Sequence, residues 1–350
     1  MVLLLTAQST GVCRAQGPKA EICCLALIDG EKMNIAHFQK LKELIQEASN
    51  TGLLTTAKEV TGFSGKKVVG TLQRISKLQA SAGHGCYLEI GVFQGMTLIS
   101  VASVLRDTPA YGIDNFSQLD TGKENEGIVL RRMEINNLGN VRLINSDYEA
   151  ALVDLNRFIG NEKVGTYFID GPHDYRSQLN CLELIKPHLS ALAVIIVDDS
   201  NYNHVRMANR DFLLANRQFK MLFEAYTDQH PMNMNEKSVQ GARDGWWNGV
   251  NIIVFDPHNE LSEMLPIASL DRELFLNDHI IHSERYGFLA PQAVRFFEHL
   301  LSLKLLSALK LFFVITAIAL RRRRELGKRH QSMNTFSDNL RDWSMNQTLQ

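Results

Sequence analysis

The pattern of apolar and polar positions changes at about residue 86. Before it, apolar residues recur every three or four positions among lysines and glutamates, as on amphipathic helices. After it, short apolar runs alternate with longer amphipathic stretches, which is typical of strands that are each followed by a helix. Five such strands are predicted, at 86–91, 110–114, 141–145, 164–170 and 192–199.

Five strand-then-helix units in succession predict a parallel sheet with helices on both faces. Two further strands are expected at 219–225 and 249–255, joined by a long polar loop that contains Trp246 and Trp247. The predicted fold is therefore α/β, a doubly wound, mostly parallel seven-stranded Rossmann-like sheet. N-terminal helices and a C-terminal apolar helix are added to it.

The same pattern divides the chain into segments. The first apolar stretch is too short for the core of a signal peptide and lacks a basic region before it, so a disordered leader is expected there. Met33 opens the first clearly periodic segment. The predicted segments are a leader at 1–32, N-terminal helices at 33–80, the sheet domain at 81–258, C-terminal helices at 259–325 and a polar tail at 326–350.

An apolar run at 305–320 is followed directly by four arginines, Arg321 to Arg324. Sixteen residues are too few to cross a bilayer, which takes about 20. Lys304, Ser307 and Lys310 form a polar stripe on its first half. The pattern predicts a helix that lies in a membrane interface, with arginines on anionic headgroups, so that 305–324 makes peripheral membrane contact. Packing on the sheet domain or on a second subunit of a homo-oligomer is the alternative.

Composition narrows the class of protein. Hydrophobic residues at 45% and charged residues at 21% are ordinary for a soluble globular protein. A net charge of -1 gives no reason to expect nucleic acid as a partner. The five cysteines are odd in number and lack the spacing of a zinc site, which favours a reducing, cytoplasmic location.

Each of the five predicted parallel strands has a carboxylate at its carboxyl end or just beyond. Ligands of open parallel sheets bind outside these ends, so the acids are expected to share one edge with the ligand. The acids, in chain order, are Glu89, Asp114, Asp147, Asp170 and the pair Asp198 and Asp199.

The first three strands supply one group of candidate residues. Gly91 and Gly95 let a ligand approach the backbone, and the helix that follows favours an anionic group. The run "GVFQG" is not G-x-G-x-x-G, which counts against a nicotinamide dinucleotide. Glu89 within the glycine turn instead suits a ligand with a positive amino group, while Asp114 is placed for ribose hydroxyls. A purely structural strand-to-helix corner is the alternative for the turn.

With these residues the chain resembles the class I S-adenosylmethionine-dependent methyltransferases. The resemblance implies that Glu89 and Gly91 hold the methionine end of the cofactor and that Asp114 holds the ribose. It further implies that Ser146 or Asp147 contacts the adenine edge. Gly95 and Thr97, at the start of the next helix, complete the predicted cofactor site.

The second group comprises Asp170, Asp198 and Asp199. Adjacent acids raise one another's pKa, and a hard divalent cation such as Mg²⁺ resolves their repulsion. The alternative is that Asp199 or Ser200 caps the next helix while Asp198 pairs with an arginine. The motifs "FIDGPHDY" and "VIIVDDSNY" resemble the metal-dependent O-methyltransferases of the catechol and macrolide-sugar type.

That resemblance implies that Asp170, Asp198 and Asp199 bind the metal. It also places His173 where the catechol enzyme has its lysine base, and the pair Asp198–Asp199 where that enzyme has Asp-Asn. With Asp170 and His173 as catalytic residues, the chain is expected to methylate a hydroxyl of a small molecule such as a sugar, a phenol or a natural product. The competing hypotheses are a nicotinamide-dependent oxidoreductase, a metal-dependent hydroxylase or hydrolase, and a non-catalytic nucleotide-binding or membrane-associated protein.

Overall fold

The structure is a computed structural model, and it describes residues 18–120, 122–227, 230–261, 264–265, 289–333 and 339–340. Its centre is a sheet with strand order β3-β2-β1-β4-β5-β7-β6-β8. The first five strands are parallel, and β7 runs antiparallel to its neighbours β5 and β6. The seven predicted strands are thus confirmed, with the two-residue β8 added at one edge. The strands are β1 (Cys86–Ile90), β2 (Ala110–Asp114), β3 (Val141–Asn145), β4 (Val164–Ile169), β5 (Leu189–Val197), β6 (Phe219–Ala225), β7 (Val250–Phe255) and β8 (Asn339–Leu340).

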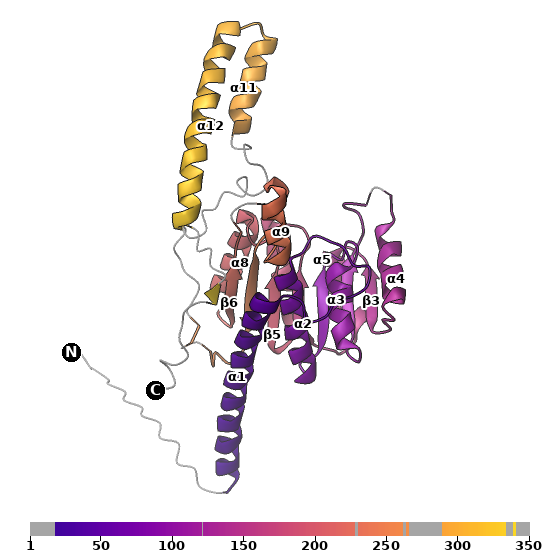
Figure 1. Ribbon diagram of the computed structural model, residues 1–350. Helices are drawn as coiled ribbons and strands as arrows, with labels where there is room; N and C mark the ends of the chain where they lie inside the picture. Colours follow the sequence, from indigo (N-terminus) through magenta and orange to yellow (C-terminus); the bar gives the residue numbers. More distant parts are fainter. Residues whose placement is uncertain are drawn as a thin grey trace, which may run out of the picture.

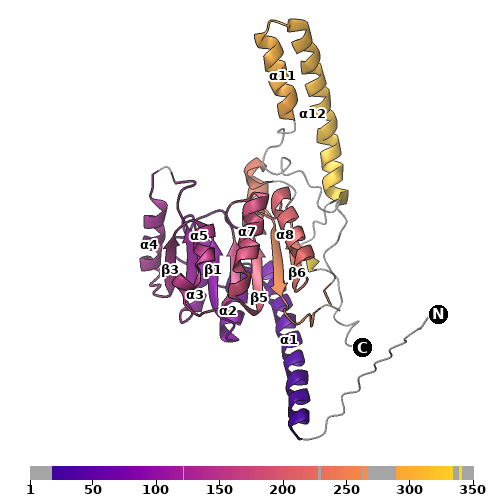
Figure 2. The same ribbon diagram turned by 180° about the vertical axis from the view of Figure 1, so that it is seen from behind.

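Helices cover both faces of this sheet (Figures 1 and 2). One core lies under α1 to α4 and the other under α5 to α8, so the domain has three layers. Strands β1 and β4 are buried at every position, which is why their sequences are continuous apolar runs rather than alternating ones. The helices are α1 (Pro18–Thr51), α2 (Lys66–Ser81), α3 (Met96–Leu105), α4 (Asn125–Ile135), α5 (Tyr148–Val153), α6 (Asn156–Ile159), α7 (Tyr175–Ile185) and α8 (Asn203–Ala215), with the 3-10 turn η1 (Lys186–His188) after α7.

The connection between β6 and β7 differs from the predicted polar loop. It contains a 3-10 turn, η2 (Pro231–Asn233), and a helix, α9 (Glu236–Asp244). Only Ala242 of α9 is buried, so the helix lacks the apolar periodicity that would have marked it in the sequence. The Asn235 side chain begins it by accepting a hydrogen bond from the Ser238 N–H at 2.9 Å.

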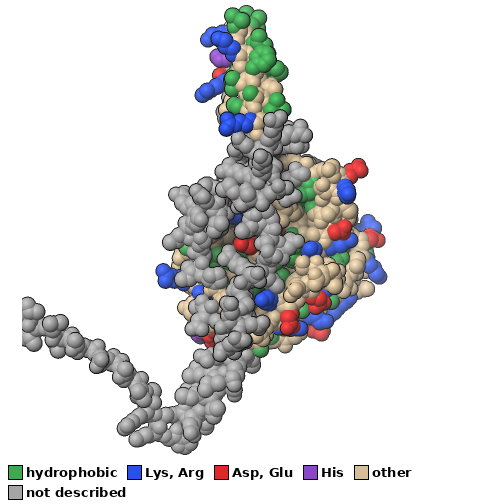
Figure 3. All heavy atoms as spheres, turned by 60° about the vertical axis from the view of Figure 1, so that its left-hand side comes forward, with side chains coloured by type: hydrophobic (Ala, Val, Ile, Leu, Met, Phe, Trp, Pro, Cys, Tyr) green, Lys and Arg blue, Asp and Glu red, His purple; other side chains and the backbone are tan. Residues whose placement is uncertain are grey.

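Two helices at the C-terminal end, α11 (Ala290–Leu301) and α12 (Leu305–Met333), form an antiparallel hairpin that projects from the sheet domain (Figures 1 and 3). Helix α12 continues through residue 326, where the sequence predicts the polar tail to start. Among the helices that the structure describes, none combines the length and the apolar character needed to cross a membrane.

At the other end of the chain, α1 begins at Pro18, within the segment 1–32 for which the sequence predicts disorder. Good helix formers such as Ala20, Glu21 and Leu25 occupy this stretch, which explains how the helix extends there. Residues 1–17 lie outside the described part of the chain.

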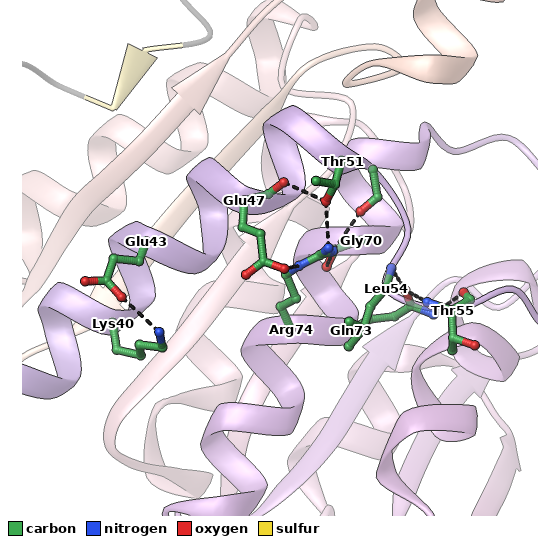
Figure 4. Close-up of polar contacts among 10 residues, drawn as sticks. Lys40, Glu43, Glu47, Thr51, Leu54, Thr55, Gly70, Gln73 and Arg74 are labelled. Atoms are coloured by element: carbon green, nitrogen blue, oxygen red, sulfur yellow. Dashed lines mark hydrogen bonds and ion pairs between the residues drawn. The ribbon is translucent and has the colours of Figure 1, made fainter.

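Two side chains of α2 bind the N-terminal helices to each other and to the sheet domain (Figure 4). Arg74, whose side chain is 4% exposed, donates to the Glu47 carboxylate at 3.0 Å, the Thr51 hydroxyl at 2.8 Å and the Gly52 carbonyl at 2.7 Å. The fully buried Gln73 binds the Leu54 N–H and donates to the Ser100 carbonyl of α3. Together they hold the end of α1, and the chain after it, against α2 and α3.

We expect Arg74→Ala to lower the free energy of unfolding by about 2–4 kcal/mol, because it removes a buried guanidinium and its hydrogen bonds to the end of α1. Lys40→Ala is the matched control, since the Lys40–Glu43 pair on the same helix hairpin is exposed. Urea denaturation of both variants measures the difference. Equal stabilities would show that Arg74 does not fasten α1.

Candidate functional site

The carboxyl ends of β2, β1, β4 and β5 lie side by side. Ile90 is in register with Ile113 on one side and Ile169 on the other, and Ile169 is in register with Val197. The residues that end these strands therefore meet along one rim, as the sequence predicts. The negative charges of Glu89, Asp114, Asp198 and Asp199 all act on the carboxyl of Asp170.

The glycine turn after β1 is fixed by contacts within the protein. Gly91 has a φ of +86°, and a Cβ at this position would lie 1.9 Å from the Asp170 carbonyl oxygen. Gly95, with a φ of +79°, precedes the first residue of α3. Any side chain at residue 91 would separate the ends of β1 and β4, so this glycine has a structural role whether or not a ligand approaches it.

Glu89 lies beneath this turn and is fully buried. It accepts hydrogen bonds from the Tyr87 hydroxyl at 2.6 Å and from the Thr97 hydroxyl at 3.2 Å. Burial raises the pKa of Glu89 to about 8, although both hydroxyls act in the opposite direction. A cationic group placed nearby would favour its ionised form.

Asp114 binds the glycine turn directly. One of its carboxylate oxygens accepts from the Val92 N–H at 2.9 Å and the Phe93 N–H at 2.8 Å, and the other accepts from the Phe116 N–H at 2.7 Å. Phe93 and Phe116 both have a left-handed φ of +50°, so the carboxylate stabilises two strained positions. Asp114 thus shapes the turn in addition to its predicted contact with ribose.

The predicted adenine contacts lie after β3. Asp147 is exposed and caps α5, where its side chain accepts from the Glu149 N–H at 2.9 Å. Ser146 is half-buried, and its hydroxyl donates to the Asp147 carbonyl at 3.3 Å. Helix capping accounts for Asp147 without a ligand, and its contact with adenine stays a prediction.

Asp170, His173 and Asp199 form the second cluster, at the ends of β4 and β5. One ligand atom from each residue lies within 4.8 Å of the others, which is compatible with a shared cation. His173 Nε2 is 2.9 Å from Asp199 Oδ2. Among the described residues this is the one cluster of three potential metal ligands.

Asp198 is not part of that cluster. It is 1% exposed; one of its carboxylate oxygens accepts from the Asp199 N–H at 2.9 Å, and the other is buried without a hydrogen-bond partner. Asp199, in contrast, has a left-handed φ of +53° and brings its carboxylate to Asp170 and His173. The structure thus combines His173, rather than Asp198, with the other two predicted metal ligands.

The charges of the second cluster are unbalanced. Burial and then the charges of Asp198 and Asp199 raise the pKa of Asp170 well above its usual value. Burial and Asp199 do the same for Asp198. Burial also opposes ionisation of Asp199, but the His173 imidazole and its hydrogen bond outweigh it and lower the pKa of Asp199. One imidazole therefore compensates one of three acids, and a cation would compensate the others.

Two further residues border this cluster that the sequence did not single out. Tyr202 stacks on His173 with ring centroids 5.4 Å apart, and the ring of His230 lies 5.7 Å from that of Tyr202. Tyr202 follows the acid pair closely in "DDSNY", a signal that could have been used. His230 comes from the β6–β7 connection, where nothing in the sequence marks it.

Trp246 and Trp247 are 2% and 7% exposed. Trp246 packs on Phe223, and Trp247 packs on Phe63, a residue of the segment between α1 and α2 that is 53% exposed. Phe63 also contacts Phe93 of the glycine turn, at 5.3 Å between ring centroids. The tryptophans are thus mainly core residues, and Phe63 is the aromatic side chain that this group presents to solvent.

Residues 88–200 match a family model described as a methyltransferase domain. No curated protein matches the sequence. A Bacillus cereus O-methyltransferase solved in complex with SAH is 18% identical, with a TM-score of 0.41 over 62% of this chain and 90% of that chain. The Streptomyces achromogenes O-methyltransferase TomG, involved in tomaymycin synthesis and solved with SAM, is 15% identical, with a TM-score of 0.40 over 61% of this chain and 96% of that one.

The family match confirms that the chain contains a methyltransferase domain, the class that the motifs at the strand ends predict. Its span runs from β1 to the residues just after β5. It therefore includes all the acids of the rim, from Glu89 to Asp199.

We expect Glu89→Gln to remove a pH dependence of stability. The pKa of Glu89 rises from 4.5 to about 8 on folding. Its contribution to the free energy of unfolding is therefore fully present below pH 4.5 and is lost as the pH rises through 8. Without ligand, the difference in free energy of unfolding between the variant and wild type should therefore shift in favour of the variant by about 3–5 kcal/mol from pH 5 to pH 8. Urea denaturation at both pH values measures this gain.

Glu43→Gln, on the exposed side of α1, is the control and should leave stability unchanged at both pH values. A Glu89→Gln variant whose stability differs from wild type by the same amount at pH 5 and pH 8 would contradict the prediction.

Proposed function

We propose that this protein uses S-adenosylmethionine to methylate a hydroxyl group of a small molecule, such as a sugar, a phenol or a natural product, with the help of a divalent metal ion. The observation that carries the proposal is the arrangement of buried and half-buried acids within the matched domain. Glu89 and Asp114 flank the glycine turn at β1 and β2, while Asp170 and Asp199 meet His173 at β4 and β5. One rim thus offers two adjacent sites of different chemistry.

The first site suits the cofactor, which supplies the methyl group. Glu89 would hold the ammonium group of its methionine part, and this contact would favour the ionised carboxylate that burial now disfavours. Asp114 would hold the ribose while it keeps the turn of Gly91 and Gly95 in place. Thr97, Ser146 and Asp147 are the remaining candidate contacts.

The second site suits a hard divalent cation such as Mg²⁺. Carboxylates are the ligands that Mg²⁺ prefers, and burial together with the neighbouring acids raises the pKa of Asp170 and Asp198, so that a bound cation would favour their ionised forms. The unpartnered buried oxygen of Asp198 is a second sign of a missing positive charge. Asp170 and Asp199 would hold the ion, with Asp198 next to them. The ion would lower the pKa of the substrate hydroxyl.

His173 is the candidate base for the hydroxyl proton. Burial alone lowers its pKa, but Asp199 and the hydrogen bond at 2.9 Å raise it above 6.5. Asp199 would stabilise the imidazolium that forms when the proton arrives, and stacking on Tyr202 holds the ring in one orientation. Phe63, which lies beside the glycine turn and is exposed, would offer the substrate an aromatic contact.

Calorimetry with S-adenosylmethionine tests the first site. We expect Asp114→Asn to weaken binding by about tenfold to a hundredfold, because one oxygen that accepts hydrogen bonds is lost where the turn and the ribose both need it. Asp199→Asn, in the second site, is the control and should bind the cofactor as wild type does. Equal affinities of both variants would contradict the assignment of Asp114.

Methyl transfer to a panel of hydroxylated metabolites, measured with labelled methyl donor, tests the second site. We expect EDTA to abolish turnover and added Mg²⁺ to restore it, with cofactor binding unaffected. His173→Gln should lower kcat by about 10²–10⁴-fold. Turnover that survives EDTA would remove the metal from the mechanism. A metal-dependent hydrolase without a methyl donor would show no S-adenosylmethionine binding in the calorimetry.

A further inference from the structure

The hairpin of α11 and α12 exposes an unusual amount of apolar surface. Helix α12 packs on α11 through Ala308, which is 3% exposed, and through the contact of Phe312 with Phe296. A separate apolar stripe of α12 at helical spacing remains uncovered. Its members Leu306, Leu309, Phe313 and Leu320 are 78%, 53%, 63% and 58% exposed.

Helix α11 adds to the same surface. Val294 and Phe297 are each 58% exposed, and Leu301, at the end of the helix, is 83% exposed. In Figure 3 the apolar side chains of the hairpin gather along one side and at its tip, while cationic side chains lie along the other side. The hairpin as a whole is therefore amphipathic, which a single-helix pattern does not reveal.

The tip of the hairpin exposes leucines on both sides of Lys304. Leu303 is 81% exposed and Leu305 is 60% exposed, although turns in water are normally built from polar residues and glycine. Leu303 even adopts a left-handed φ of +59°, which costs energy for a branched side chain. A tip of exposed leucines is expected where the turn enters an apolar medium.

The charges of the hairpin are mostly of one sign. Residues 289–321 contain four cationic side chains, Arg295, Lys304, Lys310 and Arg321, against the single carboxylate of Glu298. Three more arginines follow directly, to Arg324. Anionic lipid headgroups would neutralise these cations, whereas a second copy of the chain would bring a hairpin of the same positive charge.

We propose that the α11–α12 hairpin lies in the surface of an anionic membrane, with its apolar stripe and leucine tip among the acyl chains and its cations at the headgroups. Neither helix crosses the bilayer, in agreement with the lack of a membrane-crossing helix in the described part of the chain. The hairpin thus tethers the methyltransferase domain to a lipid surface. The occupant of the apolar face is lipid and not a second copy of the chain.

Co-sedimentation of the full chain with lipid vesicles tests this proposal. We expect binding to phosphatidylcholine vesicles that contain phosphatidylglycerol, much weaker binding to phosphatidylcholine alone, and release by salt. Leu303→Asp combined with Leu306→Asp should lower the partition coefficient at least about tenfold, because two carboxylates would then take the place of leucines among the acyl chains. Aspartate tolerates the left-handed φ at residue 303, so the turn is kept.

Val153→Asp is the matched control, because Val153 is 71% exposed on α5 of the methyltransferase domain. It should bind vesicles as wild type does. Circular dichroism and sedimentation velocity of all variants show whether each is folded and monomeric. In a further variant, Phe313→Trp, brominated lipid should quench the fluorescence of the introduced tryptophan more strongly than that of the native tryptophans.

Two results would overturn the proposal. One is vesicle binding that is absent in wild type or unchanged in the double aspartate variant. The other is a wild-type dimer that the double variant dissociates while neither form binds vesicles, which would make a second copy the occupant of this face.

Discussion

The repulsion among buried and half-buried carboxylates at the carboxyl edge of the sheet is the constraint on which the rest of the site depends. Parallel register brings Asp170 close to the acids of β1, β2 and β5, and partial burial limits the screening of their charges by water. The protein compensates only part of this charge, through His173 at Asp199 and through backbone N–H groups at Asp114. The remaining charge would favour the cationic ligands proposed for this edge, an ammonium group and a metal ion.

The two halves of the site are joined through the backbone. The Asp170 N–H donates to the Ile90 carbonyl at 2.9 Å, and the Asp170 carbonyl occupies the space that any Cβ of Gly91 would need. The glycine turn of the cofactor half therefore cannot shift without moving a predicted metal ligand. This rigid connection is suited to a reaction in which a methyl group and an acceptor oxygen must be held in line.

Much of the fold could be predicted from the sequence, because strands buried on both faces leave continuous apolar runs and each run ends in an acid. Which acids meet could not be predicted, because this depends on single backbone angles. The left-handed φ of Asp199 directs its carboxylate to His173 and Asp170, while its neighbour Asp198 is buried apart from them. His230 and α9 were missed because their segment is polar and has no helical periodicity. Apolar periodicity does not mark the start of α1 at Pro18, because there the helix depends on the helix propensity of its residues.

The helices before and after the sheet domain each add a surface that the sheet domain lacks. Helices α1 and α2 cover the face of the sheet next to α3, and Arg74 and Gln73 fix the chain between them so that Phe63 comes to lie against Phe93 and Trp247. Helices α11 and α12 instead leave their apolar side chains uncovered. Most apolar side chains of α2, and of α1 from Phe38 onward, are buried, so the exposed leucine tip contrasts with the way the chain packs its other added helices. The uncovered hairpin is better explained by an apolar medium outside the protein, which would hold the catalytic rim at a constant distance from a membrane.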